Sequence, residues 1–122
     1  MKNPVNWFEI YVQDMARARA FYEAVFQAKL QLLNKPPTEM WSFPGDQTSY
    51  GSPGSLVYAK GMASGGNSIL VYFRCEDCAV EESRIAAAGG KVERPKMSIG
   101  QFGFVTIARD TEGNMFGLHS VK

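Results

Sequence analysis

The sequence runs twice through the same order of expected elements: one strand, one helix and then three strands. The first round opens with NWFEIYVQD (6–14) and continues into MARARAFYEAVFQA (15–28). The second opens with SILVYFR (68–74) and continues into CAVEESRIAAAGG (78–90). Asp14 and Asp77 stand at the same strand-to-helix junction in the two rounds. Such an internal repeat predicts a fold built from two copies of one supersecondary unit.

The first strand alternates between two kinds of side chain. Phe8, Ile10 and Val12 occupy every second position, which is the period of a strand with two different faces. In the segment that follows, apolar residues recur at helical spacing, and the Asp14 carboxylate is suited to cap the first turn. We expect the apolar strand face to pack under the helices.

Three short strands are expected after each helix. The segments are two short strands between Leu30 and Phe43, then SLVYAK (55–60), KVERPKM (91–97), FGFVTIARD (102–110) and NMFGLHSV (114–121). The Gly- and Ser-rich stretch KGMASGGNS (60–68) reads as a connector. We therefore expect one α+β domain over 1–122, with module one at about 4–60, a connector at 61–67 and module two at about 68–122. The competing interpretation is a single α+β sheet without internal symmetry.

The composition excludes several classes of protein. A hydrophobic content of 45% supplies enough apolar material for a core and argues against disorder. The 13 basic and 12 acidic residues are scattered, so no basic stripe for nucleic acid is expected. No segment approaches the roughly 18 apolar residues that span a bilayer, and the first residues lack the apolar core of a signal peptide. We expect a cytoplasmic protein with no nucleic-acid or membrane partner.

Both cysteines lie in the stretch RCEDCAV, as Cys75 and Cys78. Three interpretations are open: a redox dithiol, half of a zinc site, or two reduced thiols near a strand-to-helix junction. A structural zinc site needs about four ligands, and the chain holds one histidine and no second cysteine pair. The two acidic residues between the cysteines oppose thiolate formation, which disfavours the redox interpretation.

Two stretches resemble motifs of a known superfamily. NWFEIYVQDMARARAFYEAVFQAKL (6–30) resembles the opening of vicinal-oxygen-chelate proteins, and RDTEGNMFGLHS (109–120) resembles their closing turn and last strand. This superfamily includes glyoxalase I, bleomycin-resistance proteins and extradiol dioxygenases. The resemblance covers essentially the whole chain. It implies two paired βαβββ modules whose mixed sheets curl around a cup, with the helices on the outside.

Metal-dependent members of that superfamily hold a divalent cation in the cup, on donors from the first and last strand of each module. Counting seven residues back from the helix-opening aspartates reaches Trp7 and Leu70, and four past the glycine of the D-x-x-G-N turn is Gly117. Matching PGSLVY (53–58) to EGNMFG (112–117) places Tyr58 at the remaining position. None of the four offers an imidazole or a carboxylate. The resemblance, applied residue by residue, therefore implies that the metal site is lost and that no residue is a metal ligand.

Residues that share a strand face with the lost donors are then expected to line the cup. Glu9 and His119 are the candidate catalytic, proton-transferring groups. The candidate ligand-binding residues are Trp7, Tyr11, Tyr58, Lys60, Tyr72, Arg74 and Met115. The Arg74 guanidinium suits a carboxylate or phosphate, and the aromatic side chains offer flat walls. Two simpler interpretations stay open, namely that Glu9 forms an ion pair with Arg74 or Lys60 and that His119 is exposed and inert.

We therefore expect a homodimeric protein that binds a small anionic or aromatic molecule without a cofactor. One alternative is a glyoxalase-like lyase or isomerase that uses Zn, Ni, Mn or Fe on shifted ligands, Glu9 and His119. A second alternative is a drug-sequestering resistance protein whose aromatic cup stacks on a planar antibiotic.

Overall fold

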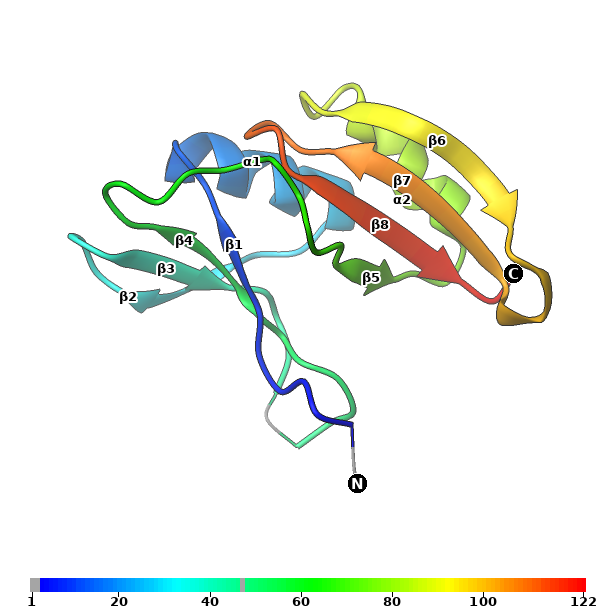
Figure 1. The fold of residues 1–122 in the computed structure, drawn as a ribbon, viewed down its shortest axis with the longest axis horizontal. Helices are drawn as coiled ribbons and strands as arrows, with labels where there is room; N and C mark the ends of the chain where they lie inside the picture. The colour runs from blue at the N-terminus through cyan, green and yellow to red at the C-terminus, as the bar shows by residue number, and fades with distance from the viewer. Residues whose placement is uncertain (1–2, 47) are drawn as a thin grey trace.

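The computed structural model describes residues 3–46 and 48–122, and within them two four-stranded sheets carry two α-helices (Figure 1). The expected order of strand, helix and three strands, repeated once, is confirmed. The first module contains β1 (Glu9–Tyr11), α1 (Met15–Phe26), β2 (Gln31–Asn34), β3 (Glu39–Ser42) and β4 (Ser55–Tyr58). The second contains β5 (Tyr72–Arg74), α2 (Cys78–Ile85), β6 (Lys91–Ser98), the 3-10 turn η1 (Gly100–Phe102), β7 (Phe104–Arg109) and β8 (Met115–Ser120).

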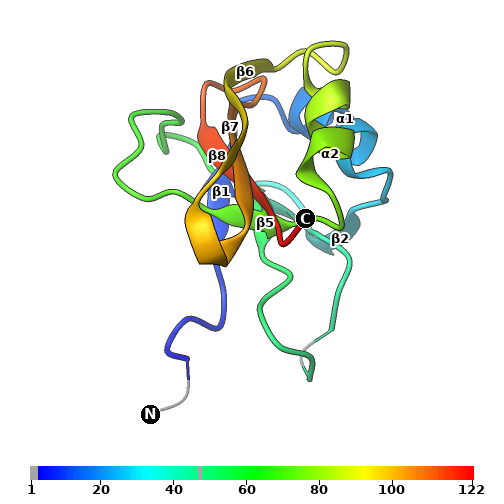
Figure 2. The ribbon, with the colours of Figure 1, turned by 90° about the vertical axis from the view of Figure 1, so that its right-hand side faces the viewer.

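The two sheets have the same topology. Their strand orders are β1-β4-β3-β2 and β5-β8-β7-β6, and in each sheet the first strand pairs in parallel with the last. The remaining pairs are antiparallel, so both sheets are mixed. Both helices lie on one side of the strands (Figure 2). The opposite faces of the two sheets are free of helices, as expected for an α+β fold with the helices outside.

Aspartates begin both helices, as the sequence predicts. Asp14 accepts a hydrogen bond from the Arg17 N–H, and Asp77 accepts one from the Ala79 N–H, each at 3.0 Å. The second helix is shorter than the expected 78–90. It ends at Ile85, and the following residues form turns that close at Gly89, whose φ of 102° favours glycine.

Several strands are also shorter in the structure than the sequence predicts. β5 begins only at Tyr72, although the apolar run starts near residue 68, and β4 ends at Tyr58. Lys60 therefore lies in the exposed turn that follows β4, not on the strand. None of the helices in the described ranges is long and apolar enough to cross a membrane.

One aromatic side chain joins the two modules. Phe73 on β5 packs with its ring centroid 4.8 Å from that of Phe26 and 5.1 Å from that of Phe43, both in the first module. It also contacts Tyr22 on α1 at 6.0 Å and Phe8 at 6.1 Å. Edge and tilted contacts of this kind stabilise aromatic clusters beyond the area they bury. The core of the protein is thus continuous across the module boundary.

The DTEGN turn between β7 and β8 is a second junction. The buried Tyr22 hydroxyl donates to Asp110 Oδ2 at 2.6 Å, and burial, followed by the Asp110 charge, raises the pKa of Tyr22 well above its usual value. Asp110 Oδ1 also accepts from the backbone N–H groups of Glu112 and Asn114. The turn is therefore fixed by the first module's helix and by its own backbone.

Glu112, in the same turn, reaches the start of α1. Its Oε1 accepts from the backbone N–H groups of Gln13 and Asp14 at 2.9 and 3.0 Å, and Arg17 donates to Oε2 at 2.7 Å. Burial acts to raise the pKa of Glu112. The hydrogen bonds outweigh it, those from Arg17 foremost, and lower the pKa to about 2. The positive end of the helix dipole favours a carboxylate at this place as well.

We predict that Glu112 makes the free energy of unfolding depend on pH in the acidic range. Because its pKa is lower in the folded than in the unfolded chain, its contribution is complete above pH 4.5 and is lost as the pH falls toward 2. Glu112→Gln should lower the free energy of unfolding at pH 7 by on the order of 3 kcal/mol and flatten its pH dependence in that window. Urea unfolding at several pH values measures both. Glu76→Gln, at an exposed carboxylate, should leave the curve unchanged, and equal effects of the two variants would contradict the assignment.

Candidate functional site

The strand faces are divided as the alternation predicts. Val12, Leu56 and Leu118 belong to the helix-side core, and Phe8 and Phe73 pack against it. Their neighbours along each strand point to the other side, which we call the open face. The open face carries Trp7, Glu9, Tyr11, Tyr72, Arg74, Met115 and His119. The register of β1 with β4 and of β5 with β8 gives the pairs Glu9–Ser55, Tyr72–Gly117 and Arg74–His119 along this face.

A cavity of about 490 Å³ lies between β1 and the connector, and we call it the junction cleft. Of the predicted site residues it holds Trp7, Glu9, Tyr11 and Met115. Glu9 Oε1 accepts a hydrogen bond from the Tyr11 hydroxyl at 2.8 Å. That bond raises the pKa of Tyr11, and burial and the carboxylate charge act in the same direction.

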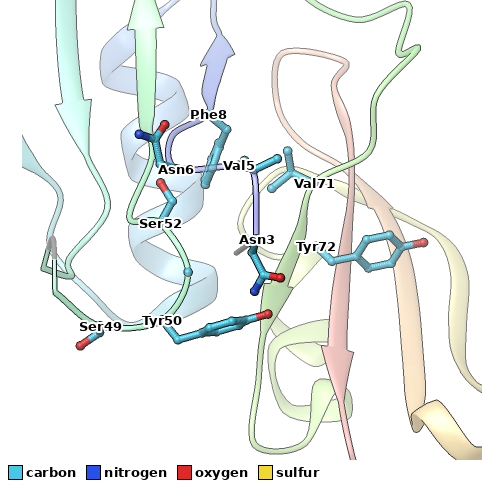
Figure 3. Close-up of a pocket in the computed structure, with 10 residues that line it drawn as sticks. Asn3, Val5, Asn6, Phe8, Ser49, Tyr50, Ser52, Val71 and Tyr72 are labelled. Carbon is cyan, nitrogen blue, oxygen red and sulfur yellow. The ribbon is translucent and has the colours of Figure 1, made fainter. Parts of the chain in front are cut away.

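Two further cavities, of about 830 and 380 Å³, lie between residues 49–53 and β5 and share part of their walls. We call them together the loop cleft. Tyr50 and Tyr72 line both parts, and Arg74 lines the smaller one. In Figure 3 the Tyr50 ring reaches below Asn3, while the Tyr72 ring turns away in the direction of β8. The side chains of Val5, Phe8 and Val71 line both the larger part of this cleft and the junction cleft.

His119 lies in a third, polar cavity of about 480 Å³ that also contains Arg74, Glu76 and Glu81. Its Nε2 is 2.7 Å from the carbonyl oxygen of Phe102. A carbonyl only accepts, so Nε2 is the donor in this contact, and in the neutral imidazole Nδ1 then carries the lone pair. Arg74 and His119 are register partners on β5 and β8, which brings these two predicted site residues side by side.

The structure therefore separates residues that the sequence places in one cup. Glu9 and His119 line different cavities, and no grouping of three His, Cys, Asp or Glu residues able to hold a metal ion occurs among residues 3–46 and 48–122. For the alternative in which Glu9 and His119 bind a metal ion, the described residues supply no third ligand. Glu9 is also not paired with Arg74 or Lys60 in the described part of the chain.

Cys75 and Cys78 are both buried and both free thiols. Burial, and after it the charge of Glu81, raises the pKa of Cys75 to about 12. A thiol with so high a pKa is almost entirely protonated at neutral pH, which removes the nucleophilic thiolate that redox chemistry needs. The pair therefore behaves as core residues at the β5–α2 junction.

Several cavity residues carry no signal in the sequence. Asn3, Val5 and Asn6 precede the first alternating run, and Tyr50 and Ser52 lie in a segment rich in Gly, Ser and Pro. Strand and helix periodicity is the basis for placing residues on faces, and neither segment has it. Only the turn residues near 49–54 mark that segment as a loop, and they do not indicate where the loop lies.

Comparison with known proteins gives the family of the chain. The model of the Glyoxalase/Bleomycin resistance protein/Dioxygenase superfamily matches residues 5–118. The chain belongs to this superfamily. Among curated proteins, none matches the chain.

Solved structures of the superfamily share the fold. A glyoxylase/bleomycin resistance protein/dioxygenase domain from Frankia sp. EAN1pec aligns over 100% of both chains, with 19% identity and a TM-score of 0.73. A mutant glyoxalase I from Zea mays matches 97% of this chain and 46% of its own, with 19% identity and a TM-score of 0.76. TnmS3, an antibiotic binding protein from Streptomyces sp. CB03234, matches 97% of this chain and 95% of its own, with 24% identity and a TM-score of 0.64.

The strand register corrects one of the four donor positions expected from the superfamily. Glu9 pairs with Ser55 in the first module, as Tyr72 pairs with Gly117 in the second. Ser55, not Tyr58, is therefore the counterpart of Gly117. Tyr58 lies on the other face and packs against the helix-side core, so its expected place in the cup was wrong.

The corrected set of donor positions is Trp7, Ser55, Leu70 and Gly117. It contains one hydroxyl, and Ser55 is fully buried with an Oγ that finds no partner among the described residues. One neutral hydroxyl does not hold a divalent cation that takes several oxygen or nitrogen donors. The residues present do not fit the metal of the superfamily's enzymes at these positions.

The last of these positions is also filled by a side chain. A Cβ built at Gly117 would run into Cδ1 and Cε1 of Tyr72, so the tyrosine ring lies where a residue other than glycine would project. Because Gly117 has no side chain, the Tyr72 ring packs against the open face of β8 at this position. Tyr72 also lines the loop cleft, although its ring turns away from it toward β8 (Figure 3).

We predict that Gly117 and Tyr72 are coupled. Gly117→Ala should destabilise the protein by about 1–3 kcal/mol, the usual cost of overpacking, because the Tyr72 ring must move. In a Tyr72→Ala background the same substitution should cost at least about 1 kcal/mol less, as contacting residues do in double-mutant cycles. Denaturant unfolding of the four proteins gives the coupling energy. Additive effects would show that the ring does not occupy this place.

Proposed function

We propose that this protein binds a small aromatic or anionic molecule in the loop cleft without the help of a metal ion. The observation that carries the proposal is the exchange at the donor positions, where Tyr72 covers Gly117 and no carboxylate or imidazole remains. A site of the superfamily's usual kind has been replaced by an aromatic wall. Apolar cavities with a few polar groups are the usual form of small-molecule sites, and both parts of the cleft fall within the usual range of volumes.

The chemistry of the cleft supports a planar ligand with a negative charge at one end. Tyr50 offers a flat surface, and Asn6 and Ser52 offer neutral hydrogen-bonding groups. Arg74 is the cation in the lining, and it makes no ion pair with another described residue. A planar guanidinium in this state is suited to a carboxylate or phosphate group.

If the protein is an enzyme, His119 is the residue placed to move a proton. It neighbours Arg74 across the β5–β8 pair, and its Nδ1 keeps a lone pair while Nε2 donates to Phe102. Glu9 lies in the junction cleft, so the two residues do not act on one ligand atom. A lyase or isomerase reaction in this protein would accordingly use one base, His119, and one arginine, Arg74.

The cytoplasmic location and the homodimer expected from the sequence belong to the same proposal. Met97 and Phe102, near the turn between β6 and β7, expose 37% and 67% of their surface, and Tyr72 exposes 49%. Exposed apolar residues of this size support contact with a second copy.

We predict that the purified protein takes up no stoichiometric metal. After incubation with Zn, Ni, Mn or Fe(II) and removal of the excess, elemental analysis should find well below one equivalent per chain. The melting temperature should not rise with any of these ions, because a bound ion would stabilise the folded state. One equivalent retained per chain, together with a raised melting temperature, would overturn the metal-free proposal.

We predict that Arg74 anchors an anionic ligand. In a thermal-shift screen of aromatic carboxylates, aryl phosphates and planar antibiotics, anionic aromatic compounds should raise the melting temperature. For a compound that binds, Arg74→Ala should weaken the affinity by about tenfold or more, the effect of losing a charge-assisted hydrogen bond. Lys29→Ala removes an exposed cation outside the cleft and should change nothing. Binding of uncharged planar antibiotics alone, insensitive to Arg74, would favour the drug-sequestering alternative.

A further inference from the structure

The junction cleft differs from the loop cleft in its charge. Among the described residues, the lining carries one acidic side chain, that of Glu9. It contains no lysine, arginine or histidine from the described part of the chain. Arg74 lines the other cleft. The two cavities share a wall but present opposite charges.

The other polar side chains of the junction cleft are already used to hold its walls together. The Asn67 amide donates to the carbonyl groups of Ile69 and Met115 and accepts from the Met115 N–H. The Asn114 amide donates to the Tyr11 carbonyl and to Asp110 and accepts from the Gly65 N–H. Both amides therefore use their two N–H donors and accept one hydrogen bond each within the protein.

Glu9, an exposed residue, is the charged group of this lining. Its Oε1 accepts from the Tyr11 hydroxyl, while Oε2 has no hydrogen-bond or ion-pair partner in the described part of the chain. An ionised carboxylate oxygen at the edge of an apolar cavity favours a positive charge beside it. The hydrogen bond from Tyr11 also holds the carboxylate in one place relative to the cavity.

Aromatic rings stand on both sides of this carboxylate. Trp7 precedes it and Tyr11 follows it at alternate positions of the chain, and both line the cavity together with Phe8 and Met115. Alternate residues of a strand lie roughly 7 Å apart on one face, so a single ligand group reaches the carboxylate and a ring at the same time. Aromatic faces attract cations, and tryptophan does so most strongly.

From these observations we infer that the junction cleft is a binding site for an organic ammonium ion. The ligand class is an amine or quaternary ammonium compound whose charged group lies against Glu9 and between the rings of Trp7 and Tyr11. A compact, strongly hydrated metal ion would gain little from the rings, whereas alkyl groups on nitrogen contact them directly. This inference does not depend on the function proposed for the loop cleft, because Trp7, Glu9 and Tyr11 do not line that cleft and the charge is the opposite one.

Choline and its uncharged carbon isostere, 3,3-dimethylbutan-1-ol, test the inference, because they have nearly the same shape and differ in charge. In a ¹H–¹⁵N NMR titration, choline should shift the indole N–H signal of Trp7 and the amide signals of β1. Its affinity should exceed that of the isostere by about tenfold or more, as expected for a carboxylate and aromatic faces acting together. Equal affinity for the two compounds, or no shift at Trp7 with choline, would overturn the inference.

Variants locate the site. Glu9→Gln keeps the shape of the side chain and should weaken choline binding by about tenfold, the loss of one charge-assisted contact. Glu76→Gln removes a carboxylate from the polar cavity beside His119 and should leave choline affinity unchanged. Equal effects of the two substitutions would show that choline responds to overall charge, and the proposed site would be wrong. In the same titration, Arg74→Ala should not change the response to choline, which separates this site from the loop cleft.

Discussion

The buried carboxylate of Asp110 is the constraint on which the arrangement of the two modules depends. Among the described residues it has no cationic partner, and it is held by the Tyr22 hydroxyl and by N–H groups of its own turn. A buried charge is tolerated only when its hydrogen bonds are made, so the turn is locked to helix α1. Because Glu112 and Asn114 extend from the same turn, the start of α1 and the carbonyl of Tyr11 are fixed as well. The side walls of the junction cleft thus follow from one turn in the second module.

The sequence predicts the elements and faces well because both depend on local periodicity. The alternation of Phe8, Ile10 and Val12 is enough to assign the open face of β1. The register of β4 fails for a physical reason. Gly54 directly precedes Ser55, whereas Gly113 stands four positions before the equivalent Gly117, so matching the two glycines shifts the strand by three residues. An odd shift turns every side chain to the opposite face, and this misplaced Tyr58.

The division of the site into separate clefts could not be predicted in the same way. Glu9 and Arg74 share the open face, and their opposite charges suggest an ion pair. Whether they meet depends on how the two sheets lie side by side, and that is set by contacts between the modules such as the packing of Phe73. The walls also include Val5 and Tyr50, from segments without periodicity, whose positions arise only from tertiary packing.

Phe8 is the residue through which the two clefts communicate. Its ring lies over Gly54, where a Cβ would collide with it, and it lines the junction cleft and both parts of the loop cleft. A ligand in one cleft that displaces the Phe8 ring would change the space available to a ligand in the other cleft. Thermodynamic reciprocity would then require each ligand to change the affinity of the protein for the other ligand by the same factor. Because Val5 and Val71 line both clefts beside Phe8, ligands bound in the two clefts would share these three side chains as a common wall.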